Sequence, residues 1–474
     1  MKLVSLFSPN LPRNLVYMLQ ASGYSAREYL SWFWQTPDIG QVMYRKTLDK
    51  TPKARWLLAA AWLIIILQLA NLVWILTDAE SGWLQLMALG WLLLVPVITA
   101  HVLVLFVWLG RLTLQKAAQG KRLSQASEVF ADHPAIKIAV AGSYGKTTMK
   151  NLLATVIAEG KNVAVTPGNL NTPLGLASFA KSLNGNEEVL IFEFGESHPG
   201  DVAELTRLVR PNFGVITGVN EAHLSTMGSL EAATNTIFEL ADGLGSAFVI
   251  GNGESAPVKA RADKKMQLYG AKGIDGWKVS GVKTDITATS FTLKKAKKTV
   301  KVRAALLGKH QIGPLCAAVD VADALGLKPE QIEAGLARVE AVEHRFKPYE
   351  LGGAIIIDDT YNGNPDGIRA GIDFADSLKG FKRKIFVTPG LVDTASAKAK
   401  LHRSIGRQAA KVFDEVVLIK NSNAPFISQG LQKGGFKGQL TQVEDPLSFY
   451  QNLESFVAAG DFVLLQNDLP DNYA

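Results

Sequence analysis

The sequence predicts an α/β protein in which a parallel-sheet domain is followed by a smaller Rossmann-like α/β domain, with two transmembrane helices preceding both. Three observations predict this class. Two long uncharged apolar runs lie near the N-terminus. From about residue 135, short β-rich runs alternate with amphipathic helical stretches, which favours a parallel sheet with helices on both faces. A second block of the same kind begins near residue 345.

Length, charge and cysteine content narrow the class of protein. A chain of 474 residues is long enough for two or three domains. Residues 1–122 hold 12 Lys/Arg against 5 Asp/Glu, whereas residues 123–474 hold 38 of each. The net charge of +7 therefore belongs to the N-terminal segment, and we expect no nucleic-acid partner. Cys316, the single cysteine, fits a reducing compartment, and its neighbours "GPLCAAVD" predict a helix interior.

The two apolar runs have the length and composition of membrane spans. Residues 56–76 form 21 positions without a charge, and residues 83–109 form 27 more, broken only by Gln85, Thr99, His101 and Pro96. A helix needs about 20 apolar residues to cross the hydrocarbon core. Tryptophans lie near the ends of both runs, where interfacial aromatic side chains belong. Two buried core helices are the alternative interpretation.

The flanking charges predict an orientation. Lysines and arginines precede the first run and follow the second, whereas the six-residue connection carries only Asp78 and Glu80. By the positive-inside rule the protein lies in the inner (cytoplasmic) membrane with two spans, and both termini and the catalytic domains are cytoplasmic. Residues 1–55 either lie along the inner membrane face or form a small soluble cap.

The alternating segments can be assigned in order. "AIKIAVA", "NVAVT", "EVLIFEFG" and "FGVITGV" are predicted strands, and 147–159 and 201–209 are predicted helices. Residues 278–305 alternate polar and apolar positions, which predicts a small antiparallel sheet. In the second block the predicted strands are "AIIIDDTYN", "KIFVTPG", "EVVLIK" and "DFVLLQND".

A glycine-rich turn joins the first of these strands to the helix after it. Its glycines let several backbone N–H groups converge on phosphate oxygens at the positive end of the helix. Lys146 would neutralise the β- and γ-phosphates, and the Thr147 hydroxyl would bind Mg²⁺. The usual glycine spacing is broken by Val140, so the motif is a shortened one, and a plain linking turn is the alternative. We predict a P-loop ATPase domain whose ATP contacts are Gly142, Ser143, Tyr144, Gly145, Lys146, Thr147 and Thr148.

The shortened motif resembles that of the Mur ligase family, whose members build peptidoglycan stem peptides by ATP-driven amide formation. Further stretches resemble the family in the same order: "TPGNLNTPLGL", "FEFGESHPGDVAEL", "GVITGVNEAHLSTMGSLE", "EHRF" and "IIDDTYNGNPDGIRAGI". The last is similar to the branch that adds D-alanyl-D-alanine. The resemblance spans residues 135–474. Together with the apolar runs, it divides the chain into four expected segments: a cytoplasmic N-terminal segment (1–55), a transmembrane hairpin with a basic linker (56–122), a central ATP-binding domain (123–342) and a C-terminal ligase domain (343–474).

The resemblance also implies roles for residues outside the loop. Glu193 and His223 would join Thr147 in binding Mg²⁺, and with Lys146 they would be the catalytic residues, although a strand-end carboxylate and a loop histidine also occur without such roles. The substrate-binding loop would include Asn169, Asn171 and Thr172. From the C-terminal domain, Arg345, Asp359 and Asn362 would contact ATP; capping a turn is the other possible role of the aspartate and asparagine.

Three departures from the family pattern bear on activity. Ile237 stands where the family carries a carbamylated lysine that bridges to a second metal ion. Gln311 and Pro314 replace the two asparagines of the segment that contacts adenine. We expect the membrane hairpin to stand in place of the N-terminal domain that holds the UDP-sugar.

The expected function is an ATP- and Mg²⁺-dependent ligase that joins an amine donor, D-alanyl-D-alanine or a related amine, to the carboxylate of a muramoyl-peptide precursor. That precursor is either UDP-linked or lipid-linked. The alternative is a membrane-anchored pseudo-ligase that organises other cell-wall enzymes. A transport ATPase is disfavoured, because the two spans carry no charged side chain.

Overall fold

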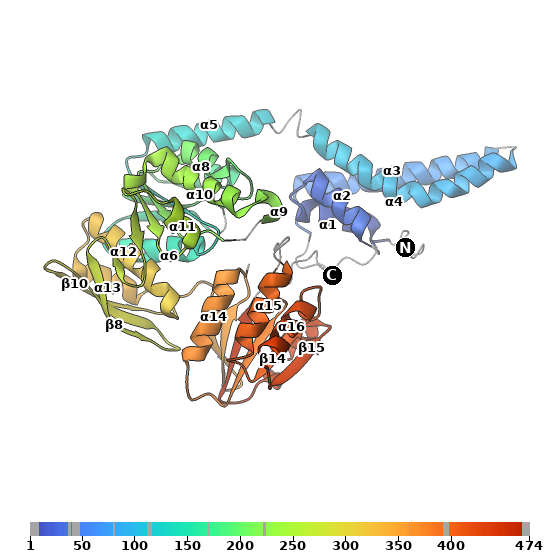
Figure 1. Ribbon diagram of the computed structural model, residues 1–474. Coiled ribbons are helices and arrows are strands. Elements are labelled where there is room, and N and C mark those ends of the chain that lie inside the picture. Colours follow the sequence, from blue (N-terminus) through green and yellow to red (C-terminus); the bar gives the residue numbers. More distant parts are fainter. Residues whose placement is uncertain are drawn as a thin grey trace. The chain divides into compact units, whose positions relative to one another are not determined.

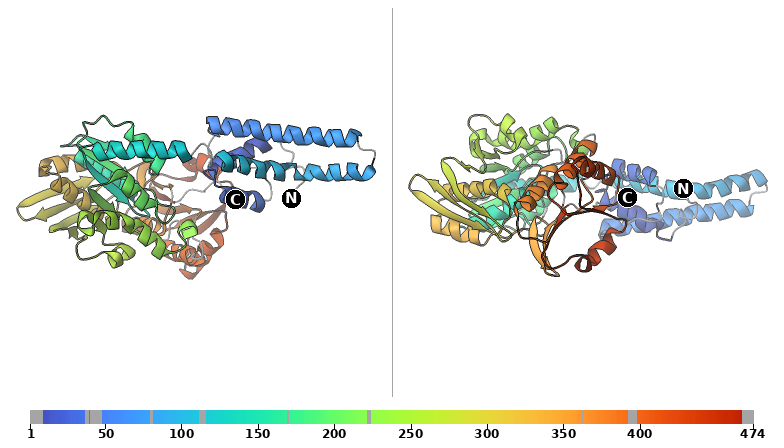
Figure 2. Two further views of the ribbon diagram at one scale, coloured as in Figure 1. Left: turned by 90° about the horizontal axis from the view of Figure 1, so that it is seen from above. Right: turned by 60° about the horizontal axis from the view of Figure 1, so that its bottom comes forward.

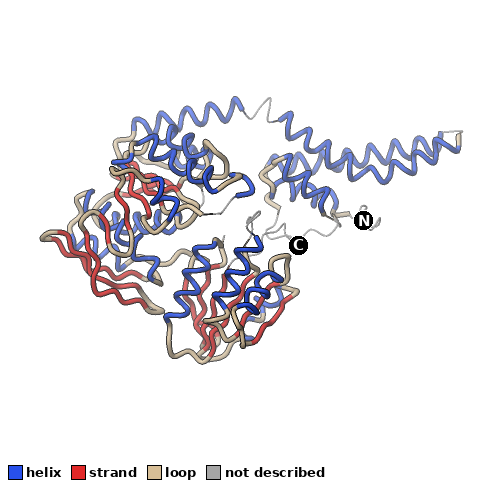
Figure 3. Tube along the Cα trace, in the orientation of Figure 1, coloured by secondary structure: helices blue, strands red, loops and turns tan. Residues whose placement is uncertain are grey.

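The computed structural model describes residues 9–36, 39, 48–78, 81–110, 116–168, 170–220, 224–361, 363–391 and 398–466. The chain forms two compact units, Met1–Lys121 and Arg122–Leu469. Figure 1 labels the elements along the chain, and Figure 3 distinguishes the helical N-terminal unit from the second unit, which contains all the strands of three sheets.

The N-terminal unit is a long helical hairpin with two short helices packed at one end (Figure 2). The hairpin consists of α3 (Pro52–Asp78) and α4 (Gly82–Gly110), and the short helices are α1 (Leu11–Ala21) and α2 (Ala26–Gln35). Gln68 Nε2 of α3 donates to Thr99 Oγ1 of α4 over 3.2 Å, a buried polar contact between otherwise apolar helices. This bond gives the buried Gln68 amide N–H and Thr99 hydroxyl oxygen a partner inside the apolar packing.

The outer surface of the hairpin is apolar. Both helices are long and apolar enough to cross a membrane. The tryptophans near their ends are mostly exposed: Trp56 by 77%, Trp74 by 63%, Trp83 by 70% and Trp108 by 54%. In a soluble protein large side chains such as these are normally buried, so a continuous surface of this kind indicates an interaction with an apolar environment.

The second unit begins with a six-stranded parallel sheet, as predicted. Its order is β2 (Val163–Val165), β3 (Val189–Glu193), β1 (Ile136–Ala141), β4 (Phe213–Ile216), β5 (Val249–Asn252) and β6 (Gln267–Tyr269). Neighbouring β1 residues serve opposite faces: Ile138 and Val140 join one core, whereas Ala139 and Ala141 join the other. This alternation is the reason that the strand reads as an unbroken apolar run.

Helices cover both faces of this sheet. One face packs against α6 (Lys146–Ile157), α12 (Ile312–Ala324) and α13 (Pro329–Ala337). The other face packs against α5 (Lys116–Asp132), α7 (Pro173–Ala180), α8 (Asp201–Val209), α10 (Leu230–Leu244) and α11 (Ala256–Arg261), and α9 (Leu224–Met227) precedes α10. Cys316 is fully buried within α12, as its neighbours predicted.

The predicted antiparallel sheet is also present. Its order is β10 (Lys298–Ala304), β9 (Thr289–Lys295), β8 (Trp277–Thr284) and β7 (Gly273–Ile274). Val300 and Val302 are buried, while Lys301 between them and Lys298 before them are exposed. One face of this sheet therefore packs on the domain core and the lysine-rich face is solvated.

The C-terminal domain contains a mixed sheet with the order β11 (Lys347–Leu351), β12 (Ala354–Asp359), β16 (Asp461–Gln466), β13 (Arg383–Thr388), β14 (Glu415–Ile419) and β15 (Gln439–Val443). The four predicted strands are confirmed, and the edge strands β11 and β15 are additional. Helices α14 (Pro365–Ser377), α15 (Lys398–Ala409) and α16 (Ala424–Lys433) cover one face; α18 (Leu453–Phe456) packs on the other, preceded by α17 (Pro446–Gln451). Two 3₁₀ turns, η3 (Ser246–Phe248) and η4 (Lys309–Gln311), lie in the middle domain.

Candidate active site

The glycine-rich loop lies where the sequence predicted, between β1 and α6. Gly142 has φ of +146°, and a Cβ there would lie 2.2 Å from Thr217 Oγ1, so only glycine fits. Gly145, with φ of +72°, is the N-cap of α6. Thr217 at the end of β4 braces the loop, because its hydroxyl donates to the carbonyl oxygen of Tyr144. The loop thus places the positive end of α6 at the carboxyl edge of the sheet.

Lys146 is paired with a carboxylate that the sequence interpretation missed. Its Nζ lies 3.0 Å from Glu196 Oε1 and 2.9 Å from Glu196 Oε2. Burial raises the pKa of Glu196, although Lys146 opposes that shift and Glu193 adds to it. A sequence signal existed, since Glu196 follows Glu193 by three residues just beyond the end of the same strand.

Glu193 is the last residue of β3 and is also paired. Its Oε2 lies 3.2 Å from the ammonium of Lys150, and Asn171 Nδ2 donates to its Oε1 over 3.4 Å. Lys150 is held in place, because it donates to the carbonyl oxygens of Thr166 (2.9 Å) and Gly168 (2.7 Å). Lys150 lies one helical turn after Lys146 on α6, so both ammonium groups point toward carboxylates beyond β3.

The predicted acceptor loop is only partly within the described structure. Asn171 contacts Glu193, as noted above, whereas the hydroxyl of Thr172 accepts the Gly175 N–H over 3.2 Å and caps α7. Thr172 therefore has a structural role here. The predicted residues Asn169, His223 and Asn362 lie outside the described residues.

The C-terminal domain contributes Arg345 and Asp359. The Arg345 guanidinium lies 4.4 Å from the centre of the Tyr361 ring. Burial lowers the pKa of Arg345, while Tyr361, Asp359 and Glu193 oppose that shift, which places the guanidinium within electrostatic reach of the middle domain's carboxylate. Burial raises the pKa of Asp359, and Gln466 Nε2 donates to this carboxylate over 3.0 Å. Arg345 thus stacks on Tyr361 and is influenced electrostatically by Glu193, whereas Asp359 is engaged within its own sheet.

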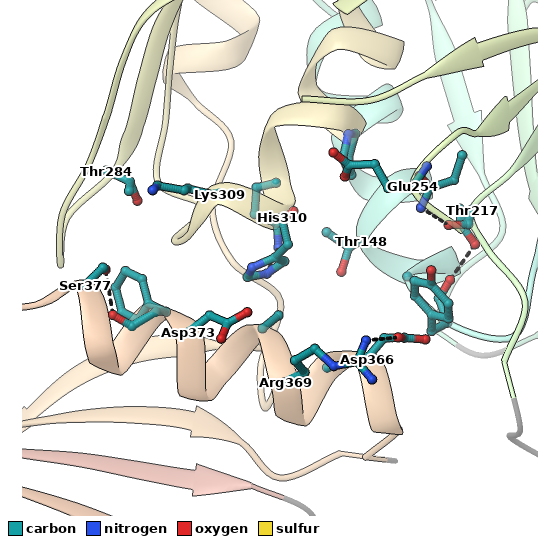
Figure 4. A pocket seen from close by; sticks show the side chains of 18 of the residues that line it. Thr148, Thr217, Glu254, Thr284, Lys309, His310, Asp366, Arg369, Asp373 and Ser377 are labelled. Carbon is teal, nitrogen blue, oxygen red and sulfur yellow. Dashed lines mark hydrogen bonds and ion pairs between the residues drawn. The ribbon is translucent and has the colours of Figure 1, made fainter. Parts of the chain in front are cut away.

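A cavity of about 950 Å³ opens beside the loop, between the middle and C-terminal domains. Figure 4 shows Lys309 and His310 of η4 on one wall and Asp366, Arg369 and Asp373 of α14 on the facing wall. Its inner end is formed by parts of the glycine-rich loop and α6, which contribute Tyr144, Gly145 and Thr148. A volume of this size suits a nucleotide-sized ligand.

The cavity combines predicted and unforeseen residues. Tyr144 packs against the backbone of Gly218, and burial raises the pKa of its phenol to about 12, with Asp366 adding to the shift. Gln311 lies in this wall, where its Nε2 is 2.9 Å from His310 Nε2. Burial lowers the pKa of His310 to about 4, so the imidazole is neutral at physiological pH. Glu254 and Asp373 lie outside the sequence motifs, whereas Arg369 lies within the last of them but was assigned no role.

The residues around Glu193 fit a divalent cation held mainly by phosphate oxygens. No group of three or more His, Cys, Asp or Glu side chains suited to a metal ion occurs among the described residues. Glu193 Oε2 and Glu196 Oε2, however, are both buried and accept no hydrogen bond. Mg²⁺ is usually bound by one or two carboxylates together with substrate phosphates and water, so this donor set is sufficient.

Ile237 lies in α10 and is fully buried within the core between that helix and the sheet. Its side chain packs among apolar neighbours and has no atom able to bind a metal ion. Ile237 is therefore a core residue of this domain.

Comparison with known proteins agrees with this geometry. Residues 140–322 match the Mur ligase middle domain and residues 344–466 match the glutamate ligase domain of Mur ligases, together well over half of the chain. The UDP-N-acetylmuramoyl-tripeptide–D-alanyl-D-alanine ligase of Bacillus subtilis is 26% identical over 331 residues, which cover 69% of this chain and 72% of that protein. The Escherichia coli enzyme of the same name is 26% identical over 315 residues, covering 63% and 68%.

Solved structures show the same fold. MurF ligase from Thermotoga maritima in complex with ADP superimposes with a TM-score of 0.66 at 23% identity, covering 74% of this chain and 81% of that chain. MurF from Acinetobacter baumannii gives a TM-score of 0.64 at 22% identity, covering 74% and 77%. With its two matching domains and its phosphate-binding loop, the chain belongs to the Mur ligase family of ATP-dependent acid–amino-acid ligases.

Proposed function

We propose that this protein adds D-alanyl-D-alanine, or a related amine, to the carboxylate of a muramoyl-peptide precursor at the inner membrane. The observation that carries the proposal is the glycine-rich loop beside a nucleotide-sized cavity, with Lys146 and Lys150 of α6 paired to the carboxylates of Glu196 and Glu193 at the end of β3. The named relatives from B. subtilis and E. coli carry this activity in their names and support this choice of substrates.

The chemistry proceeds in two balanced steps. The acceptor carboxylate attacks the γ-phosphorus of ATP, the bond to the ADP oxygen breaks, and an acyl phosphate forms. The amine nitrogen then attacks the acyl carbon, the bond to the phosphate oxygen breaks, and the amine loses a proton. The products are one amide, ADP and phosphate. No enzyme nucleophile is needed, which is consistent with a site made of lysines, carboxylates and one arginine.

The residues of this chain would act by positioning and by offsetting charge. ATP would lie in the cavity with its phosphates on 142–148, where the α6 N-terminus and Lys146 attract negative charge. Mg²⁺ would be held by Glu193, Thr147 and His223, and its charge would offset that of the phosphates when bound. Asn171 and its loop would face the acceptor, and Arg345 would stabilise the charge that develops at the transferred phosphoryl group.

The apolar hairpin supports a membrane location. Its exposed apolar surface suits lipid, and the charges flanking α3 and α4 support a cytoplasmic location of the ligase domains. An enzyme held there would meet a lipid-linked acceptor in two dimensions; a UDP-linked acceptor would instead make the hairpin an anchor only.

Phosphate release by the detergent-purified full chain tests the proposal. ATP and Mg²⁺ are supplied alone, with UDP-linked muramoyl tripeptide plus D-alanyl-D-alanine, or with a lipid-linked precursor plus the same amine. We expect release only when an acceptor is present, and its loss in Lys146→Ala by a factor on the order of 10²–10³. Lys161→Ala is the control, because that lysine forms an exposed ion pair with Glu188. Absence of release with every acceptor would contradict the proposal.

A pseudo-ligase that organises other cell-wall enzymes is the second candidate. The observation in its favour is Ile237, whose buried side chain cannot supply the carboxylate of a carbamylated lysine. Such a protein would bind ATP in the same cavity without turnover. Binding of ATP with no release of phosphate under all three conditions would favour it.

A further inference from the structure

Glu196 has no role in the chemistry described so far, yet it occupies a central position. It lies three residues beyond Glu193, its side chain is almost fully buried, and it pairs with Lys146, the lysine that faces the phosphates in our proposal. A carboxylate in this position competes with a bound phosphate for the same ammonium group. A buried carboxylate is energetically costly unless it is paired with a positive charge. If Lys146 pairs with a bound phosphate instead, the negative charge of Glu196 is left unpaired.

The neighbouring ion pair of Lys150 with Glu193 cannot neutralise the charge of Glu196. Lys150 is already bonded to two backbone carbonyl oxygens and lies 3.2 Å from Glu193. The four side chains therefore form a closed set of two ammonium groups and two carboxylates. When the Lys146 ammonium pairs with the triphosphate of ATP instead of Glu196, these side chains carry an excess of negative charge.

Two carboxylate oxygens in this set contact a lysine ammonium without forming a hydrogen bond. Glu193 Oε2 and Glu196 Oε2 are shielded from solvent, and neither accepts a hydrogen bond even though each faces a lysine ammonium. A divalent cation near both would satisfy these oxygens and offset the excess charge. Position 237, where the family places a further carboxylate, supplies only a buried isoleucine.

We propose that Glu196 exchanges partners: it neutralises Lys146 while the site is empty, and with ATP bound it joins Glu193 in holding the divalent cation. Glu196 thereby replaces the carboxylate that position 237 does not supply. This inference rests on the proposed function only in requiring that the site bind ATP. It makes Glu196 both a competitor of metal-free ATP and a ligand of the metal–ATP complex.

The test compares the detergent-purified wild type with Glu196→Gln, which keeps the shape and removes the charge. ATP binding is measured calorimetrically in EDTA, and Mn²⁺ binding to the protein–ATP complex by electron paramagnetic resonance. We expect metal-free ATP to bind about 5-fold or more tightly to the variant, because its competitor for Lys146 is gone. We expect Mn²⁺ to bind about 10-fold or more weakly, because a ligand is gone. A merely structural role would not move the two affinities in opposite directions.

Two further variants complete the design. Glu196→Asp retains the charge and should recover most of the Mn²⁺ affinity. Glu159→Gln, at the far end of α6 where the carboxylate pairs with Arg338, should leave both affinities unchanged. Thermal unfolding of each variant verifies that it is folded.

The outcomes separate this inference from the proposed function. If the Gln variant matches the wild type in either affinity, or if both affinities fall together, the exchange of partners is wrong while ATP binding by the site stands. If the wild type binds no ATP with or without Mn²⁺, the proposed function fails, and the inference is overturned with it.

Discussion

Asn220 Nδ2 lies 3.0 Å from Asn364 Oδ1 and 3.1 Å from Asp366 Oδ2, so one amide group of the middle domain bonds two residues at the start of α14. Asn220 follows β4, and Asn364 is the N-cap of α14, where its Oδ1 also accepts the Gly367 N–H. The contact therefore joins the carboxyl edge of one sheet to the helix that forms a wall of the cavity in the other domain.

Replacing Asn220 with alanine should loosen the two domains without removing the cap of α14. Each hydrogen bond contributes about 0.5–1.5 kcal/mol, so we expect ATP affinity to fall about 3- to 10-fold. Calorimetry measures the affinity, and small-angle scattering should show a larger radius of gyration for the variant without ligand. Asn162→Ala, an exposed asparagine of the same domain that bonds Asn186, is the control. Equal affinities for Asn220→Ala and the wild type would contradict the role of this contact.

Ile237 should not tolerate replacement by the lysine that the family resemblance led us to expect there. Its side chain is fully buried among apolar residues of α10 and the sheet, so a lysine there would bury an unpaired charge. We expect Ile237→Lys to lower the free energy of unfolding by roughly 3–5 kcal/mol. Ile237→Leu should cost less than about 1.5 kcal/mol. Chemical denaturation measures both. A stable lysine variant that binds additional Mn²⁺ would show that the position faces the site.

His310 should make stability depend on pH in the acid range. Its pKa is about 4 in the folded protein against 6.5 ordinarily, so between these pH values the unfolded chain binds a proton that the folded protein does not. The stability conferred by a neutral His310 is therefore complete above pH 6.5 and decreases as pH falls toward 4, by at most about 3 kcal/mol. Chemical denaturation at a series of pH values measures the free energy of unfolding, which should vary less with pH for His310→Gln than for the wild type. The same pH dependence in both proteins would show that the imidazole does not titrate in this way.

The proposed membrane hairpin predicts opposite labelling of two engineered cysteines. Ser81 lies in the connection between α3 and α4, and Ser124 is exposed on α5. An impermeant maleimide should label Ser81→Cys in cells whose outer barrier is opened, and Ser124→Cys only after the inner membrane is permeabilised. Cys316 gives little background, because it is fully buried and burial raises the pKa of its thiol to about 12. Equal labelling of both sites before permeabilisation would exclude two spans in this orientation.

Local patterns in the sequence determined many of the helices, strands and loop positions of this protein. The apolar runs of α3 and α4, the strand–glycine–helix junction at 136–148 and the position of Glu193 at a strand end all follow from residues close together in the chain. Such features depend on helix and strand periodicity and on the backbone freedom of glycine, which act over a few residues. For the same reason the antiparallel sheet was predictable from its alternation alone.

Only the tertiary structure decided which side chains meet. The pairs of Lys146 with Glu196 and of Lys150 with Glu193 join α6 to the end of β3, and they exist because β1 and β3 are neighbours in the sheet. The hydrogen bonds of Asn220 to Asn364 and Asp366 require the two domains to be docked. The last strand, β16, lies in the middle of its sheet between β12 and β13. Strand order and domain docking depend on packing between residues far apart in the chain, and no local pattern records that packing.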